Sequence, residues 1–162
     1  MRVAVTGTPG TGKTTAVELV ETALPVVHLN ELIREAGLHR GRDEERDSLY
    51  ADLDAVADRL PEEALVESHL AHHLPADRVV VLRCHPGELA ERLDGRESAA
   101  SVEENAEAER LDVVLAEAVE RHGRESVYEI DTTGRTPGAV AADIEAVLAG
   151  ERAPSAGTVS FL

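Results

Sequence analysis

The sequence is poor in aromatic residues and cysteine and has no long apolar run. Among its 162 residues are two tyrosines, one phenylalanine and no tryptophan. The single cysteine, Cys84, has no partner for an internal disulfide, which excludes a disulfide-stabilised scaffold. No apolar stretch approaches the ~20 residues that a membrane-spanning helix needs. We therefore expect a soluble, cytoplasmic protein without membrane contact.

Cationic residues are also scarce, because 32 acidic residues against 16 basic ones give a formal net charge of −16. This charge argues against DNA binding and against broad electrostatic contact with RNA. With so few lysines and aromatics, it is typical of proteins from a cytoplasm that holds molar salt. At about 1 M salt the Debye length falls to about 3 Å, which screens the self-repulsion of the chain. We predict that folding and activity require high salt.

The only lysine of the chain, Lys13, lies in a phosphate-binding motif. Residues 7–14 read GTPGTGKT, the complete G-x-x-x-x-G-K-[ST] pattern. The glycines let successive backbone N–H groups point at one phosphate, at the N-terminus of the helix that follows. The ammonium group of Lys13 can then reach the β- and γ-phosphates, and the hydroxyl of Thr14 is placed to bind Mg²⁺. The motif predicts a nucleotide-binding protein.

Short apolar runs alternate with amphipathic segments along the chain. Near-continuous apolar runs such as 79–82 are typical of parallel strands that are covered on both faces. We predict an α/β P-loop NTPase fold, a five-stranded parallel sheet with helices on both faces. One domain spans 1–149, and 150–162 forms a loose, flexible tail. The predicted strands are 2–6, 26–28, 64–67, 78–83 and 127–131, and the predicted helices are 13–24, 29–36, 51–60, 86–94, 101–122 and 136–149.

Two polar segments, 37–50 and 94–101, interrupt this alternation. In a parallel sheet of this kind, such insertions lie over the carboxyl ends of the strands, where ligands bind. Arg34, Arg92 and Arg96 lie in or beside these segments. Phosphoryl transfer needs cations on both substrates and on the moving group, so these arginines are candidates for that role. The alternative is that each is a surface arginine paired with one of the many carboxylates.

Several short motifs extend the comparison beyond the phosphate-binding loop. These motifs are NELIRE at 30–35, DLD at 52–54, ESH at 67–69, VLR at 81–83, ERL at 91–93 and EENAE at 103–107. In their order and spacing the chain resembles the small adenylate kinases of archaea and eukaryotes, of the isoenzyme 6 type, which are also described as small-subunit ribosome assembly factors. With the acidic composition, the resemblance indicates a halophilic archaeal source.

The resemblance implies a nucleoside monophosphate kinase-like fold with a short lid. The implied reaction is Mg²⁺-dependent transfer of a phosphoryl group from ATP to AMP, which gives two ADP, with other monophosphates as possible acceptors. The alternative is an ATPase that assembles the small ribosomal subunit in contact with ribosomal protein uS11 and small-subunit rRNA. The resemblance implies that the ATP phosphates are held by Gly10, Gly12, Lys13, Thr14 and Thr15. A monophosphate-binding element at 28–51 would place Arg34 on AMP. A lid at 95–105 would place Arg96 on ATP, with Arg92 near the transferred phosphoryl group.

Two further residues carry implied roles at the end of the third predicted strand. Glu67 would hold Mg²⁺ through a water molecule, although the family more often has aspartate there. His69 is the residue on which ATPase activity in this family would depend, or else an ordinary polar residue at the start of a helix. His69, His72 and His73 also suggest zinc, but the sequence offers no cysteine or further nearby ligand to complete a tetrahedral site.

Overall fold

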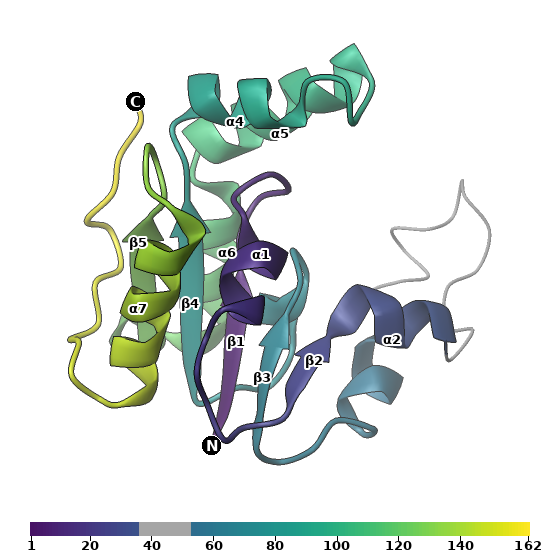
Figure 1. The fold of residues 1–162 in the computed structure, drawn as a ribbon, viewed down its shortest axis with the longest axis vertical. Coiled ribbons are helices and arrows are strands. Elements are labelled where there is room, and N and C mark those ends of the chain that lie inside the picture. The colour runs from purple at the N-terminus through teal and green to yellow at the C-terminus, as the bar shows by residue number, and fades with distance from the viewer. Residues whose placement is uncertain (36–52) are drawn as a thin grey trace.

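A five-stranded parallel sheet forms the centre of the molecule (Figure 1). The computed structural model describes residues 1–35 and 53–162. The strand order β2-β3-β1-β4-β5 confirms the predicted P-loop fold, and all five strands have the predicted bounds. The strands are β1 (Arg2–Thr6), β2 (Val26–His28), β3 (Ala64–Glu67), β4 (Arg78–Arg83) and β5 (Val127–Asp131).

Alternate residues of the central strands pack against different helices, which is why these strands are apolar almost throughout. Val3 and Val5 of β1 lie in a core with α1 (Lys13–Glu18) and α7 (Pro137–Leu148). Ala4 faces the opposite core, which includes α2 (Leu29–Glu35), helical residues 53–57 and α6 (Val113–His122). The sheet is therefore covered on both faces, as predicted.

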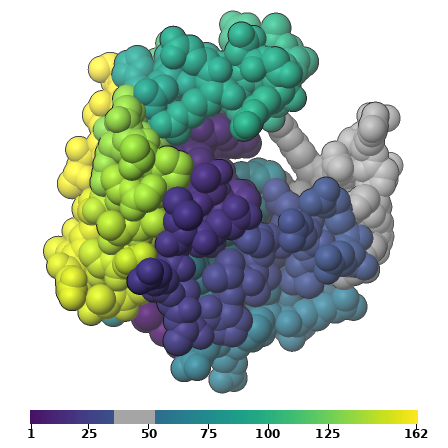
Figure 2. Space-filling view, viewed as in Figure 1, coloured from purple at the N-terminus to yellow at the C-terminus, as the bar shows by residue number. Residues whose placement is uncertain are grey.

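Two helices extend over the carboxyl ends of the strands. α4 (Pro86–Leu93) follows β4, and α5 (Ala99–Arg110) runs back above the phosphate-binding loop. Figure 2 shows the molecule hollowed between α4–α5 and α1. The predicted lid residues 95–105 form the turn between these helices and the first half of α5.

Several predicted helices are shorter in the structure than their patterns suggested. The helix predicted at 13–24 ends at Glu18, and the helix predicted at 51–60 ends at residue 57. The helix predicted at 101–122 is interrupted at Leu111 and Asp112, and Asp112 has a left-handed φ of 57°. Its carboxylate accepts a hydrogen bond of 2.5 Å from Nη2 of Arg83, which lies at the end of β4. This tertiary contact holds a conformation that a pattern of apolar residues does not reveal.

The last residues of the chain lie along β5, which differs from the loose tail that their composition suggested. The amide of Ser155 donates to the carbonyl of Val127 (3.0 Å), and Nη2 of Arg152 donates to the carbonyl of Glu129 (3.1 Å). The amide of Thr158 donates to the buried carboxylate of Glu129 (3.0 Å). β5 is an edge strand, so its unpaired polar groups gain partners from the tail.

Only the first part of the predicted monophosphate-binding element, 28–51, belongs to the described residues. Its first residues form the end of β2 and α2, whereas 36–52 lie outside the described residues. Within the described ranges, no helix has the length and apolar character needed to cross a membrane.

Candidate active site

The phosphate-binding loop joins β1 to α1 through two glycines in the left-handed region. Gly10 has a φ of 95° and Gly12, which precedes α1, has a φ of 88°. A Cβ atom at Gly10 would come within 2.9 Å of the side chains of Leu89 and Leu93. Glycine is therefore required at position 10 both for the backbone turn and for close packing of the loop under α4.

The ammonium group of Lys13 lies within this loop. Its Nζ donates to the carbonyls of Gly7 (2.9 Å) and Thr8 (3.1 Å). Burial lowers the pKa of Lys13 to about 8, against the opposite influence of Glu67 and Glu109. Nucleotide phosphates would offer stronger partners than two neutral carbonyls, because their negative charge adds direct Coulomb attraction to the hydrogen bonds.

Thr14 and Glu67 bring two oxygen donors together at the start of α1. The hydroxyl of Thr14 donates to Oε1 of Glu67 at 3.1 Å, and Nδ1 of His28 lies 2.8 Å from the same oxygen. Glu67 is almost completely buried, at the end of β3 and beside β1. Hydroxyl and carboxylate oxygens are hard ligands of the kind that Mg²⁺ prefers. The glutamate side chain reaches Thr14 directly, so this pair fits the predicted magnesium role.

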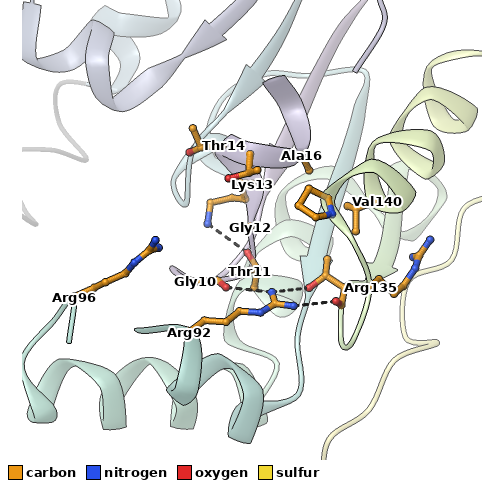
Figure 3. Close-up of a pocket in the computed structure, with 13 residues that line it drawn as sticks. Gly10, Thr11, Gly12, Lys13, Thr14, Ala16, Arg92, Arg96, Arg135 and Val140 are labelled. Carbon is orange, nitrogen blue, oxygen red and sulfur yellow. Dashed lines mark hydrogen bonds between the residues drawn. The ribbon is translucent and has the colours of Figure 1, made fainter. Parts of the chain in front are cut away.

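A cleft of about 540 Å³ opens in front of the loop (Figure 3). This volume suits a small-molecule ligand such as a nucleotide. The loop forms one wall, arginines of the α4–α5 region form a second, and the segment between β5 and α7 forms a third. The lining residues are Gly10 to Ala16, Arg92, Arg96, Thr132, Arg135, Pro137 and Val140.

The two arginines of the α4–α5 region differ in their surroundings. Nη1 of Arg92 donates to the carbonyl of Gly10 (3.3 Å), while Nη2 donates to Glu88 (2.6 Å) and to the carbonyl of Thr132 (3.0 Å). Figure 3 shows this guanidinium between the phosphate-binding loop and the segment leading to α7. The side chain of Arg96 is exposed at the edge of the cleft. Arg92 therefore holds two walls of the cleft together, whereas Arg96 can extend toward a ligand.

Thr15 also lies on the wall of this cleft. Arg34 is exposed at the end of α2 and lines neither this cleft nor the second cavity, which is described below. His69 lines the second cavity, where burial first and the charge of Lys13 second lower its pKa to about 4. His69 is thus neutral at pH 7.

The second cavity, of about 510 Å³, lies on the other side of the phosphate-binding loop. Its walls come from the loop itself, from the segment after β3, and from α5 and α6. The lining residues are Thr8, Pro9, His69, Leu70, His72, His73, Glu97, Ser101, Glu104, Asn105, Ala108, Val113, Val114 and Glu117.

A buried ionic network beneath the site was not foreseen from the sequence. Oε1 of Glu109 accepts from the hydroxyl of Thr8 (2.9 Å), and its Oε2 accepts from Nε of Arg83 (3.1 Å) and the amide of Cys84 (2.8 Å). Nη1 of Arg83 donates to Glu129 at 2.8 Å. The network joins the loop, β4, α5 and β5, so it fixes α5 relative to the phosphate-binding loop. In the sequence, the only signal for this network was Arg83, a charged residue at the end of an apolar strand.

Comparisons with known proteins agree with this geometry. A family profile described as "AAA domain" matches residues 3–112. The chain is 72% identical to the "Putative adenylate kinase" of Natronomonas pharaonis, with 99% of this chain and 98% of that protein covered. It is 58% identical to the protein of the same name from Halobacterium salinarum, over 99% of this chain and 98% of that protein.

Solved structures show the same fold at much lower sequence identity. A shikimate kinase from Acinetobacter baumannii superposes with a TM-score of 0.67 at 16% identity, covering 93% of this chain and 94% of that one. A shikimate kinase from Aquifex aeolicus gives a TM-score of 0.57 at 15% identity, covering 93% and 97%. At such identities the likeness concerns the fold alone.

Proposed function

Since the chain belongs to the AAA-domain family and to the archaeal proteins named "Putative adenylate kinase", we propose that it transfers the γ-phosphoryl group of ATP to AMP. The observation that carries the proposal is the cleft in which the phosphate-binding loop, Arg96 and the β5–α7 segment face one another. The names of these relatives mention no ribosomal role, so the assembly function is not proposed.

Binding of ATP begins with the triphosphate on the loop amides. The Nζ of Lys13 would leave the carbonyls of Gly7 and Thr8 for the β- and γ-phosphate oxygens. The apolar side chains of Pro137 and Val140 offer a surface for the nucleotide base. Thr14 and Glu67 would hold Mg²⁺, which neutralises charge on the phosphates when it is bound.

The chemical step needs no general base, because the attacking oxygen of the AMP phosphate is already anionic. A bond forms between this oxygen and the γ-phosphorus while the bond to the β–γ bridging oxygen breaks, which leaves two ADP. Charge on the transferred group would then be stabilised by Lys13 and Arg96. Arg34 is proposed to orient the acceptor phosphate. Closure of the α4–α5 region would exclude water and so prevent hydrolysis.

The test is ADP formation from ATP and Mg²⁺ in about 2 M KCl, a concentration chosen for screening, with and without AMP. The variant is Lys13→Ala, and Arg59→Ala serves as a control that removes one exposed cation far from the loop in sequence. We expect AMP-dependent ADP formation in the wild type and in the control, and its loss in Lys13→Ala. ADP formation that does not depend on AMP would overturn the kinase proposal in favour of an ATPase. If ADP formation depends on AMP, the same assay with UMP, CMP or GMP in place of AMP would define the range of acceptors.

A further inference from the structure

We propose that His72, His73 and Glu117 form a binding site for a divalent transition metal ion, with Zn²⁺ as the best fit, on the wall of the second cavity. The two histidines are adjacent in η1 (Ala71–His73), the short helix after β3, and the glutamate belongs to α6. This site is separate from the oxygens of Thr14 and Glu67, and it does not depend on the proposed kinase reaction.

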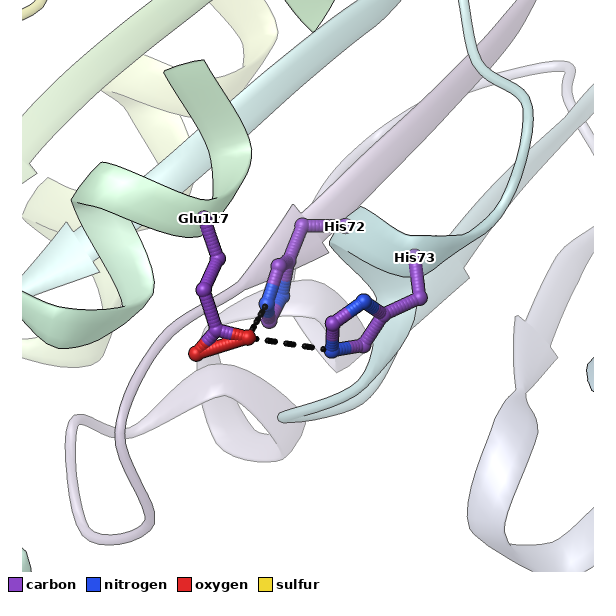
Figure 4. A group of neighbouring side chains, drawn as sticks. All are labelled: His72, His73 and Glu117. Atoms are coloured by element: carbon purple, nitrogen blue, oxygen red, sulfur yellow. Dashed lines mark ion pairs between the residues drawn. The ribbon is translucent and has the colours of Figure 1, made fainter. Parts of the chain in front are cut away.

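The three side chains converge on one point (Figure 4). Nε2 of His72 lies 3.5 Å from Oε2 of Glu117, and Nε2 of His73 lies 3.3 Å from the same oxygen. One ligand atom from each of the three residues lies within 4.8 Å of the others. Their convergence results from the fold, because α6 brings Glu117 to η1 from far along the chain.

The separation between His72 and Glu117 suits ligands of one metal ion better than a direct hydrogen bond. An N–H···O hydrogen bond has a donor–acceptor distance of about 2.7–3.2 Å, and the His72–Glu117 distance is longer. In a tetrahedral zinc site with metal–ligand distances of about 2.0–2.2 Å, neighbouring ligand atoms are roughly 3.3–3.6 Å apart. The two distances to Oε2 therefore match the edge of a zinc tetrahedron.

His72 provides an independent observation, because its polar atom is buried without a partner. The side chain is 1% exposed, and Nε2 has no hydrogen-bond partner among the described residues. Native proteins seldom leave such an atom unsatisfied, so each case requires an explanation. This nitrogen points toward Glu117, and a metal ion between them would satisfy it.

The other nitrogen of His72 is held as in known metal sites. Nδ1 lies 2.7 Å from the hydroxyl of Thr6, the last residue of β1. Histidine ligands commonly donate their second ring N–H to an oxygen, which fixes the ring and leaves the opposite nitrogen free to bind metal.

The donor set selects the class of metal and leaves a place for a fourth ligand. Two imidazole nitrogens with one carboxylate favour zinc and similar transition ions over Mg²⁺, which prefers oxygen ligands. The sequence offered no further ligand near the histidines, whereas the fold supplies Glu117. The cavity beside the cluster leaves room for water as the remaining ligand. A bound ion would join η1 to α6 across one wall of this cavity.

The test is direct metal binding by tag-free protein. The protein is first stripped of metal with chelator and then returned to about 2 M KCl, because this salt screens weak binding of metal ions to surface carboxylates. Zn²⁺ is measured by calorimetry, and Co²⁺ by the visible absorption of a tetrahedral site. The variants are His73→Ala and Glu117→Ala, which alter partly exposed side chains and spare the buried His72. Glu120→Ala, an exposed residue of the same helix, is the matched control.

We expect one Zn²⁺ per chain, retained in excess Mg²⁺, and a loss of affinity of more than about tenfold in both ligand variants but not in the control. Zn²⁺ should also raise the melting temperature of the wild type and of Glu120→Ala only. Two outcomes would overturn the proposal. One is that the wild type binds neither ion, and the other is that all variants bind equally, which would indicate only the acidic surface.

Discussion

Replacing Arg83 by methionine tests whether the buried network beneath the site stabilises the fold. Arg83 is 1% exposed, and its guanidinium contacts Glu109, Glu129 and Asp112 at 3.1, 2.8 and 2.5 Å. The carboxylates of Glu109 and Glu129 are themselves buried. Methionine would fill much of the volume of the arginine but leave both negative charges without a cation.

The expected cost follows from the burial of these charges. Removing one partner of a buried ion pair destabilises a protein by about 3–5 kcal/mol. In a chain of this length, each kcal/mol lowers the melting temperature by about 2–4 °C. We therefore expect the melting temperature of Arg83→Met to fall by roughly 6–20 °C.

Thermal unfolding followed by circular dichroism in about 2 M KCl would measure this change. The matched control is Arg110→Met, because Arg110 is exposed and pairs with Glu107 on the same helix. An exposed pair of this kind contributes about 0–1 kcal/mol. Adding Glu129→Gln to Arg83→Met should restore part of the loss, since it removes one stranded charge. If Arg83→Met melted no lower than the control, the stabilising role of the network would be refuted.

Four further predictions follow from particular features of the site and of the charge. Gly10→Ala should lose roughly 1–3 kcal/mol of stability and bind ATP more weakly, because Gly10 has a φ of 95° and a Cβ would press on Leu89 and Leu93. Thermal melting measures the loss of stability, and calorimetry measures the loss of ATP affinity. ATP phosphates favour protonated Lys13, whose pKa is about 8 in the free protein, so the Kd for ATP should rise above that pH by up to about tenfold per pH unit. A Kd that stays constant from about pH 7 to about pH 9.5 would contradict this. The pKa of His69 is lowered from 6.5 to about 4, so as the pH falls the unfolded chain takes up a proton first. The contribution of neutral His69 to the free energy of unfolding is complete above pH 6.5 and is lost toward pH 4. Denaturant unfolding should therefore show a smaller loss of this free energy over the same pH range in His69→Gln than in the wild type. The melting temperature should rise from about 0.1 M to about 2 M KCl, and an unchanged value would refute the predicted need for salt.

The sequence by itself determined the sheet and the phosphate-binding loop. The strands could be located because each is a short apolar run bounded by polar residues, and residues such as Val3 and Ala4 are buried whichever face they meet. The loop could be located because its chemistry is local. Its glycines, Lys13 and Thr14 all lie within residues 7–14, so their spacing along the chain is also their arrangement in space.

Only the tertiary structure decided which distant side chains share a site. Glu109 reaches both Thr8 and Arg83, Glu117 faces His72, and the tail satisfies Glu129, yet no spacing in the sequence connects these residues. Their positions depend on how helices cross the ends of the strands. Periodicity indicates which side of a helix is buried, but it does not indicate which partner lies opposite. For polar groups that partner is decisive, because a buried charge or imidazole is stable only where another segment supplies its counterpart.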